Sequence, residues 1–158
     1  METGYTHVYT GEGKGKTTCA LGLALRAVGA GKRVFIGQFL KSDETSEIKA
    51  LKEFLPMITV EQYGKNAEAG YEKAMSAILC GGYDVVILDE INTAVSKGFL
   101  SEQEEIALID AKPKETELIL TGRYATDSVI EKAGLVTEMR PVKHYFDKGV
   151  RARSGIEK

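Results

Sequence analysis

The chain of 158 residues has no tryptophan and two cysteines, and no apolar run approaches the ~20 residues that span a membrane. Two cysteines are too few for a disulfide framework, so Cys19 and Cys80 are expected to be inert, reduced thiols. The first residues also lack the basic and apolar regions of a signal peptide. These absences argue against a membrane protein and against a disulfide-stabilised secreted domain, and they predict a cytoplasmic protein.

The chain has no large excess of either charge, because 21 Lys and Arg residues stand against 23 Asp and Glu residues, for a formal net charge of −2. A dedicated nucleic-acid binder normally carries a strongly basic face, so no nucleic-acid partner is expected. The exception is a basic C-terminal tail, residues 140–158, in which six Lys and Arg residues stand against two acidic ones. With 43% apolar and 28% charged residues, the chain matches the size and composition of one folded domain spanning residues 1–158.

One stretch, Gly11 to Thr18 (GEGKGKTT), concentrates glycine, lysine and threonine between an expected strand at 7–10 and an expected helix at 16–30. Glycines allow successive backbone N–H groups to face an anion, and the following helix aims its own free N–H groups at the same place. The stretch therefore predicts a phosphate-binding loop, in which Lys16 contacts phosphates and Thr17 offers its hydroxyl to Mg²⁺. The alternative is a Gly/Lys-rich surface turn, but such turns rarely lead straight into an uncharged helix.

The loop is one residue shorter than the standard pattern G-x-x-x-x-G-K-[ST], which requires a glycine where Thr10 stands. A strand before the loop and a helix after it are nevertheless the context that the pattern needs. The expected nucleotide-binding residues are the loop and two arginines: Gly11, Glu12, Gly13, Lys14, Gly15, Lys16, Thr17, Thr18, Arg26 and Arg123.

The helix after the loop is expected to be buried on most sides, with Cys19 inside, because Arg26 is its only charge between positions 17 and 30. Arg26 shares one stripe with the small residues Thr18, Gly22 and Gly29, which would permit close packing. Arg26 then either reaches back to a phosphate or escapes to solvent at the helix end, and the sequence favours neither.

Apolar runs of strand length alternate with helical patterns along the rest of the chain. The further expected strands are 33–40, 57–62, 84–89, 117–121 and 135–140, and the further expected helices are 44–55, 67–79, 101–113 and 126–133. This alternation predicts a single-domain, three-layer α/β fold of the P-loop class, with a mostly parallel sheet of about six strands and helices on both faces.

A second signal is the apolar run 85–88, which leads directly into Asp89 and Glu90. A carboxylate at a strand end beside a phosphate loop can hold Mg²⁺ directly or through water. Such an acidic strand end is equally often a helix cap when taken alone, but its pairing with the loop favours metal. The expected metal ligands are Thr17, Asp89 and Glu90, and Arg123, after the 117–121 strand, is expected at the same edge.

Taken together, these residues resemble the P-loop ATP:corrinoid adenosyltransferases over most of the chain. Besides the loop, the resemblance rests on 23–27 (LALRA), 38–41 (QFLK), 86–92 (VILDEIN), 120–123 (LTGR), 140–144 (RPVKH) and 155–157 (GIE). It implies a RecA-like sheet, a homodimer, ATP with Mg²⁺ or Mn²⁺, a corrinoid substrate such as cob(I)alamin, and a flavoprotein as reductant.

The chemistry implied by the resemblance is attack of Co(I) on the ribose 5′ carbon of ATP, with triphosphate as the leaving group. Such a reaction requires positioning and stabilisation of charge rather than a general base, and Lys16 and Glu90 are the catalytic candidates. The candidates for the corrinoid side are Gln38, Tyr63, Asn92, Arg140, Lys143 and His144. His144 is interpreted as an anion contact or a structural hydrogen-bonding residue in preference to a cobalt ligand.

The segment between Tyr63 and Tyr71 departs from the family. Relatives usually carry a longer, Trp-bearing segment there, which helps to remove the lower axial ligand of the corrinoid. Two other functions stay open. A P-loop kinase or ATPase, cleaving at the γ-phosphate, is disfavoured by the short loop, whereas a non-catalytic nucleotide or corrinoid sensor is not disfavoured by any residue.

Overall fold

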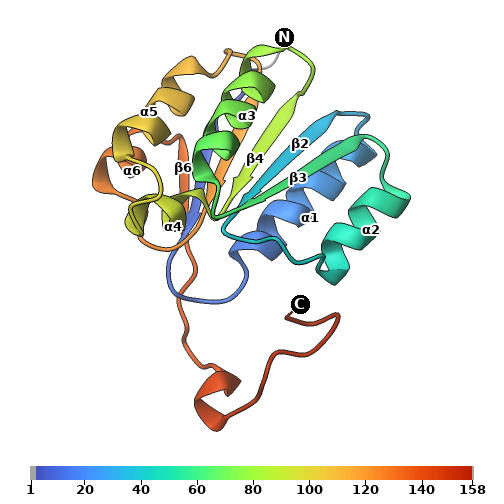
Figure 1. Cartoon of the computed structure of the whole chain (residues 1–158), viewed down its shortest axis with the longest axis vertical. Coiled ribbons are helices and arrows are strands. Elements are labelled where there is room, and N and C mark those ends of the chain that lie inside the picture. The colour runs from blue at the N-terminus through green and yellow to red at the C-terminus, as the bar shows by residue number, and fades with distance from the viewer. Residues whose placement is uncertain (1–2, 158) are drawn as a thin grey trace.

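Six apolar runs form the strands of one sheet in the computed structural model, which describes residues 3–157 (Figure 1). The strands are β1 (Thr6–Thr10), β2 (Val34–Phe39), β3 (Ile58–Gly64), β4 (Val85–Asp89), β5 (Glu117–Thr121) and β6 (Leu135–Glu138). Their spatial order is β3-β2-β4-β5-β1-β6, and each neighbouring pair is parallel. The predicted α/β fold with a mostly parallel sheet is confirmed.

Helices connect the strands and cover both faces of the sheet. They are α1 (Lys16–Gly29), α2 (Ser46–Phe54), α3 (Ala67–Leu79), α4 (Ile91–Ser96), α5 (Glu102–Ala111), α6 (Asp127–Lys132) and the 3-10 helix η1 (Tyr145–Lys148). The sequence did not predict α4 and η1, because they are too short to show a helical apolar period. Within residues 3–157, no helix has the length and apolar character needed to cross a membrane.

Two apolar cores flank the sheet, because alternate residues of each strand face opposite sides. Val8 and Leu88 belong to the core under α3, α4, α5 and α6, whereas Ile36 and Ile87 belong to the core under α1 and α2. With both faces covered, the central strands read as continuous apolar runs. That pattern is what made these strands visible in the sequence.

The prediction that α1 is buried on most sides is wrong. Its buried residues lie on one face only, and they are Lys16, Ala20, Ala24 and Ala27. Cys19 is exposed, and the stripe formed by Thr18, Gly22, Arg26 and Gly29 faces solvent. A β-carbon added at Gly22 or Gly29 would meet no atom within 4 Å. The helix therefore packs on the sheet mainly through alanines, with Leu21, Leu23 and Val28 partly buried at the edge of that core and Leu25 exposed.

The carboxyl ends of the parallel strands meet at one edge of the sheet, and the backbone there is unusual. Among residues 3–157, three non-glycine residues have positive φ: Leu40 at 61°, Glu90 at 63° and Tyr124 at 63°. Each follows the end of a strand, β2, β4 and β5 respectively. Left-handed backbone at non-glycine residues is costly and clusters at ligand sites, so this edge is where a functional site is expected.

The chain beyond β6 leaves the body of the protein, forms η1 and returns toward the loop that precedes α1 (Figure 1). Lys14 Nζ donates to the carbonyl oxygen of Ile156 over 3.1 Å. Within the tail, Glu157 accepts hydrogen bonds from Tyr145 and from Arg153, whose guanidinium also lies over the Tyr145 ring. The basic tail is thus a closed loop that returns to the phosphate-binding loop.

Candidate functional site

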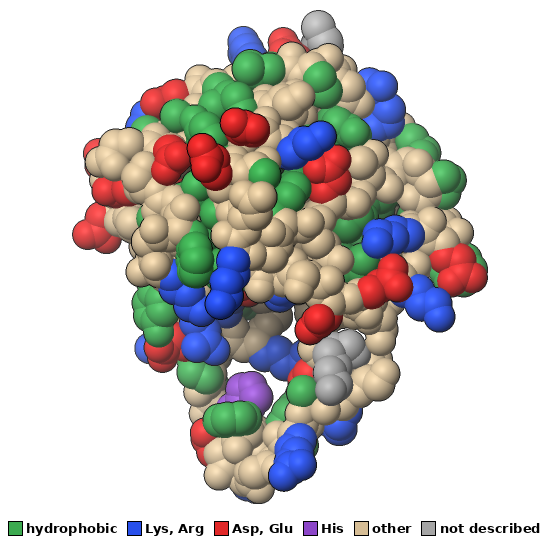
Figure 2. All heavy atoms as spheres, in the orientation of Figure 1, with side chains coloured by type: hydrophobic (Ala, Val, Ile, Leu, Met, Phe, Trp, Pro, Cys, Tyr) green, Lys and Arg blue, Asp and Glu red, His purple; other side chains and the backbone are tan. Residues whose placement is uncertain are grey.

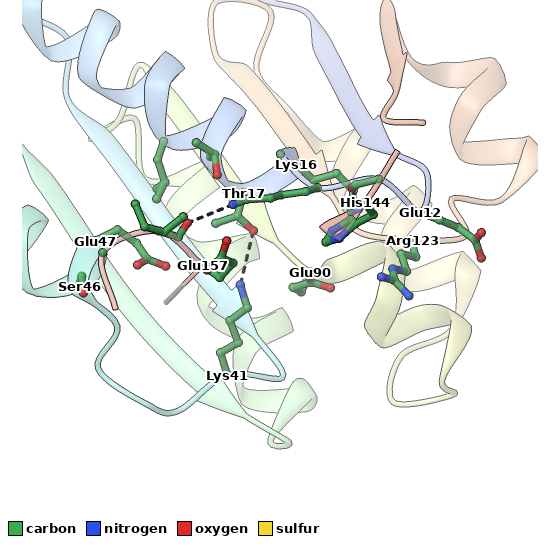
Figure 3. A pocket seen from close by; sticks show the side chains of 17 residues that line it. Glu12, Lys16, Thr17, Lys41, Ser46, Glu47, Glu90, Arg123, His144 and Glu157 are labelled. Atoms are coloured by element: carbon green, nitrogen blue, oxygen red, sulfur yellow. Dashed lines mark hydrogen bonds between the residues drawn. The ribbon is translucent and has the colours of Figure 1, made fainter. Parts of the chain in front are cut away.

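A pocket of about 750 Å³ opens at the carboxyl edge of the sheet, between the body and the tail. Figure 2 shows this hollow, with Lys and Arg side chains gathered along it. Its walls come from the loop, from segments that follow β2, β4 and β5, and from the tail (Figure 3). The lining residues outside the loop are Leu21, Lys41, Ser46, Glu47, Glu90, Arg123, His144, Gly155, Ile156 and Glu157.

The loop follows β1 and ends at Gly15, the N-cap of α1, whose φ is 123°. No side chain caps the first turn of α1, so its free N–H groups are available to an anion. Gly11 and Gly13 lie against the chain after β6, where an added β-carbon would come within 2.4 and 2.7 Å of the Met139 carbonyl oxygen. The Gly13 N–H donates to that same oxygen over 2.7 Å. The glycines are therefore required by this close approach, which braces the loop.

Lys16 is buried, and its ammonium donates to the Gly13 carbonyl oxygen over 2.7 Å. Burial lowers the pKa of Lys16, and the positive charge of Arg123 lowers it further, while Glu90, Asp89 and Glu12 act in the opposite direction. The amine thus sits within the loop and lines the pocket. An anion bound in the pocket would raise the pKa of Lys16 and stabilise its charged form.

Asp89 connects several elements at the carboxyl edge of the sheet. Its side chain is 1% exposed, and its carboxylate accepts four hydrogen bonds. Oδ1 accepts from Thr17 Oγ1 at 2.8 Å and from Thr121 Oγ1 at 2.7 Å. Oδ2 accepts from Gln38 Nε2 at 2.8 Å and from Lys41 Nζ at 3.2 Å. One carboxylate therefore joins the loop to the carboxyl ends of β2, β4 and β5.

The donor set suits Mg²⁺ rather than a metal held in a protein cage. Thr17 donates its proton to Asp89, which leaves the oxygen lone pairs of Thr17 for a cation, and the half-buried Glu90 lines the same pocket. Within the described part of the chain, no group of three or more His, Cys, Asp or Glu side chains could hold a metal. Mg²⁺ typically takes one or two protein oxygens and completes its shell with water and phosphates. Thr17 and Glu90 would hold such an ion, and Asp89 would orient Thr17.

The two arginines proposed for nucleotide binding lie in different places. Arg123 follows β5 and lines the pocket, and its backbone N–H donates to Thr93 Oγ1 over 3.0 Å. Arg26 is exposed near the last turn of α1, where it lines a separate cavity of about 260 Å³ together with His7 and Glu117. The structure therefore brings Arg123 to the loop and leaves Arg26 outside the pocket.

The corrinoid candidates on β2, β3 and α4 are mostly enclosed. Gln38 is buried and accepts a hydrogen bond from Gln62 while donating to Asp89. The Tyr63 ring packs at 5.3 Å, centroid to centroid, from the Phe39 ring. Asn92 is 1% exposed, and neither polar atom of its side chain has a hydrogen-bond partner in residues 3–157. None of Gln38, Tyr63 and Asn92 lines the pocket.

Among the tail candidates, His144 lines the pocket, whereas Arg140 and Lys143 are exposed and do not line it. The Nδ1 atom of His144 accepts the backbone N–H of Phe146 over 3.0 Å and so caps η1. His144 therefore has a structural hydrogen bond that holds it at the pocket wall.

Sequence reasoning gave no role to several residues that the structure brings to this site. Lys41 and Thr121 bind Asp89, and Glu47 and the tail residues Ile156 and Glu157 line the pocket. A usable signal existed for Lys41 and Thr121, since each is polar and lies at or just after a strand end of a parallel sheet. In the tail, the run 155–157 carries the family resemblance but does not by itself place these residues at the loop, because the return of the tail depends on long-range contacts.

A parallel sheet with a glycine-rich loop after its first strand, facing an acid at another strand end, is the architecture of the P-loop nucleotide-binding proteins. Within that class, the chain belongs to the family described as ATP:corrinoid adenosyltransferase BtuR/CobO/CobP, whose family model matches residues 2–157.

Curated bacterial proteins agree with this family. The chain is 36% identical to a corrinoid adenosyltransferase of Escherichia coli K12 and 38% identical to the corrinoid adenosyltransferase CobA of Salmonella typhimurium. Both matches cover 99% of this chain and 86% of the relative. A corrinoid adenosyltransferase of Pseudomonas aeruginosa is 33% identical, over 99% of this chain and 84% of the relative.

Proposed function

We propose that this protein transfers the 5′-deoxyadenosyl group of ATP to the Co(I) centre of a corrinoid and releases triphosphate. The observation that carries the proposal is the bond from Thr17 to Asp89, which places the phosphate loop against the strand-end acids in a chain of this family. Relatives that cover nearly the whole chain are named corrinoid adenosyltransferases.

The residues of the pocket have separate tasks in this reaction. Lys16, the free N–H groups at the start of α1 and Arg123 bind the triphosphate and stabilise the charge that it gains on leaving. Thr17 and Glu90 supply oxygens for a divalent cation. When bound, Mg²⁺ or Mn²⁺ neutralises phosphate charge and lowers the energy of the leaving group.

The step itself balances without a protein base. The electron pair of Co(I) forms the new bond to C5′. The bond from C5′ to the bridging oxygen breaks, and triphosphate leaves with the electron pair of that broken bond. No proton moves in this displacement, so the site has to hold ATP still, expose C5′ to the cobalt and exclude water. The tail, which closes one side of the pocket, contributes to that exclusion.

The remaining assignments stay predictions that come from the family resemblance. The corrinoid is expected to meet Gln38, Tyr63, Asn92, Arg140, Lys143 and His144, of which His144 lies at the pocket wall. A homodimer, a flavoprotein reductant and a cytoplasmic location are expected on the same ground.

The test is to incubate the protein with ATP, Mg²⁺ and chemically reduced cob(I)alamin, and to identify both products. We expect adenosylcobalamin by absorbance and inorganic triphosphate by phosphorus NMR, in equal amounts. ADP with inorganic phosphate, formed without corrinoid, would instead indicate a P-loop ATPase. Binding of ATP and corrinoid without any product would favour a sensor.

A further inference from the structure

Lys41 is held beside the pocket by the backbone on either side of it. It follows Leu40, whose φ of 61° turns the chain sharply after β2. The Leu40 N–H donates to the Gly64 carbonyl oxygen over 2.8 Å, and the Gly64 N–H donates to the Lys41 carbonyl oxygen over 3.1 Å. Two hydrogen bonds to the last residue of β3 therefore fix the point from which the Lys41 side chain starts.

The Lys41 ammonium lies between two groups that would bind or orient a metal. Its Nζ is 3.2 Å from Asp89 Oδ2 and 3.4 Å from Thr17 Oγ1. Figure 3 shows the Lys41 side chain pointing toward Thr17, with a dashed line for the hydrogen bond between them. Among the described residues, Lys41 forms the only ion pair with Asp89, whose carboxylate is 1% exposed. Lys41 is therefore the counter-ion of a buried charge, which would be costly to leave unpaired.

A metal ion at Thr17 and the ammonium in this position exclude each other. Mg²⁺ lies about 2.0–2.1 Å from its oxygen ligands. An ion bound to Thr17 Oγ1 would then meet a like charge that touches the same oxygen, in a partly buried place where repulsion is weakly screened. Binding of the metal thus requires the ammonium to move away from Thr17 and Asp89.

We propose that Lys41 is a positioning residue that holds the place of the metal ion and makes metal binding depend on the nucleotide. Without a nucleotide, the ammonium neutralises Asp89 and keeps divalent cations out. When a metal–triphosphate enters, the phosphates offer Lys41 a new partner in the pocket that it already lines, and the cation takes over the neutralisation of this edge. The proposal rests on the proposed function only in taking Thr17 as a metal ligand.

The experiment measures Mn²⁺ binding to the nucleotide-free protein, with free Mn²⁺ followed by electron paramagnetic resonance. We expect Lys41→Met to bind Mn²⁺ at least about tenfold more tightly than the unmodified protein, since one positive charge near the ligands is gone. With ATP present, the same variant should bind the Mn²⁺–nucleotide complex more weakly, because a phosphate partner is lost. Equal or weaker Mn²⁺ binding by nucleotide-free Lys41→Met would overturn the proposal.

Three further variants separate this role from a general change of charge or fold. Lys14→Met removes a lysine of the same pocket whose ammonium bonds Ile156 instead, and should raise Mn²⁺ affinity less than Lys41→Met does. Lys41→Arg keeps a positive charge and should bind Mn²⁺ as weakly as the unmodified protein does. Adding Thr17→Val to Lys41→Met should abolish the increase in Mn²⁺ affinity, because the expected metal ligand is lost. An equal gain in Lys14→Met would also overturn the proposal. Should Lys41→Met fail to fold by circular dichroism, Lys41→Gln replaces it, with the same outcomes.

These results do not depend on the adenosyl transfer assay. Failure of the unmodified protein to form adenosylcobalamin would reject the proposed function. The Mn²⁺ titrations would still decide whether Lys41 keeps divalent cations out of the nucleotide-free site.

Discussion

The hydroxyl of Thr121 donates to Oδ1 of Asp89 over 2.7 Å, and this bond ties together the ends of the neighbouring strands β5 and β4. The same Thr121 oxygen accepts the backbone N–H of Glu90 over 2.9 Å, where the chain turns into left-handed backbone. One side chain thus supports both acidic residues of the site.

Replacing Thr121 by Val keeps the shape of the side chain and removes both hydrogen bonds. We expect a loss of roughly 1–3 kcal/mol in the free energy of unfolding, because buried polar partners are left unsatisfied. ATP binding in the presence of Mg²⁺ should weaken as well, since Asp89 orients Thr17. Urea denaturation and calorimetry measure the two effects. Thr137→Val, on the exposed edge strand β6, is the control. Equal stability and equal ATP affinity in Thr121→Val and Thr137→Val would show that the hydrogen bond from Thr121 to Asp89 is dispensable.

Lys16→Ala should weaken triphosphate binding about 10- to 100-fold without unfolding the protein, because a charged hydrogen bond contributes about 1.5–3 kcal/mol. The fold should persist because α1 packs through Ala20, Ala24 and Ala27 rather than through Lys16 alone. Calorimetry with ATP gives the affinity, and circular dichroism checks the fold. Lys32→Ala, at an exposed lysine beyond α1, serves as control. Unchanged affinity in folded Lys16→Ala would remove Lys16 from the phosphate site.

Stability should depend on pH through Glu105 of α5. Its side chain is fully buried, and neither carboxylate oxygen has a hydrogen-bond partner in residues 3–157. Burial raises the pKa of Glu105 from 4.5 to about 7, with a smaller contribution from Glu102. Between these two values the folded chain binds more protons than the unfolded chain, so stability falls as the pH rises. Above pH 7, ionisation of the buried Glu105 lowers the free energy of unfolding by its full amount, roughly 3 kcal/mol.

Glu105→Gln should remove this dependence, because the amide does not titrate. The free energy of unfolding, measured by urea denaturation between pH 4.5 and 8, should fall with pH more steeply in the unmodified protein than in the variant. Glu131→Gln, on the exposed side of α6, should retain the dependence. Identical pH profiles for the unmodified protein and Glu105→Gln would contradict the prediction.

The connection from β3 to α3 predicts a strong dependence on the reductant. Only residues 65 and 66 separate these elements, and a β-carbon added at Gly70 would lie 2.7 Å from the Tyr63 ring. With no tryptophan and no free space there, the chain is expected to be poor at removing the lower ligand of cob(II)alamin.

Adenosylation should therefore run readily when a strong chemical reductant supplies cob(I)alamin, and slowly when a flavin donor must reduce enzyme-bound cob(II)alamin. The measurement compares the rates of adenosylcobalamin formation at equal ATP and Mg²⁺. Equal rates would show that other side chains of this protein remove the ligand.

Local patterns in the sequence determined the six strands, the helices longer than one or two turns, and the position of the loop. Apolar runs mark strands covered on both faces, and a glycine-rich stretch before a helix marks a phosphate site, so each can be read within a short window. The rule that parallel strands end at one edge then also brought Asp89, Glu90 and Arg123 near the loop.

Tertiary structure alone decided which side chains meet at that edge and which faces stay open. The bond from Thr17 to Asp89 spans 72 positions, and that from Lys14 to Ile156 spans 142. Such pairs depend on how the elements pack, as does the burial of one face of α1 and the exposure of Cys19. The pairing of Lys41 with Asp89 belongs here too, because it requires the turn at Leu40 and its hydrogen bond to Gly64, which no local pattern of residue types specifies.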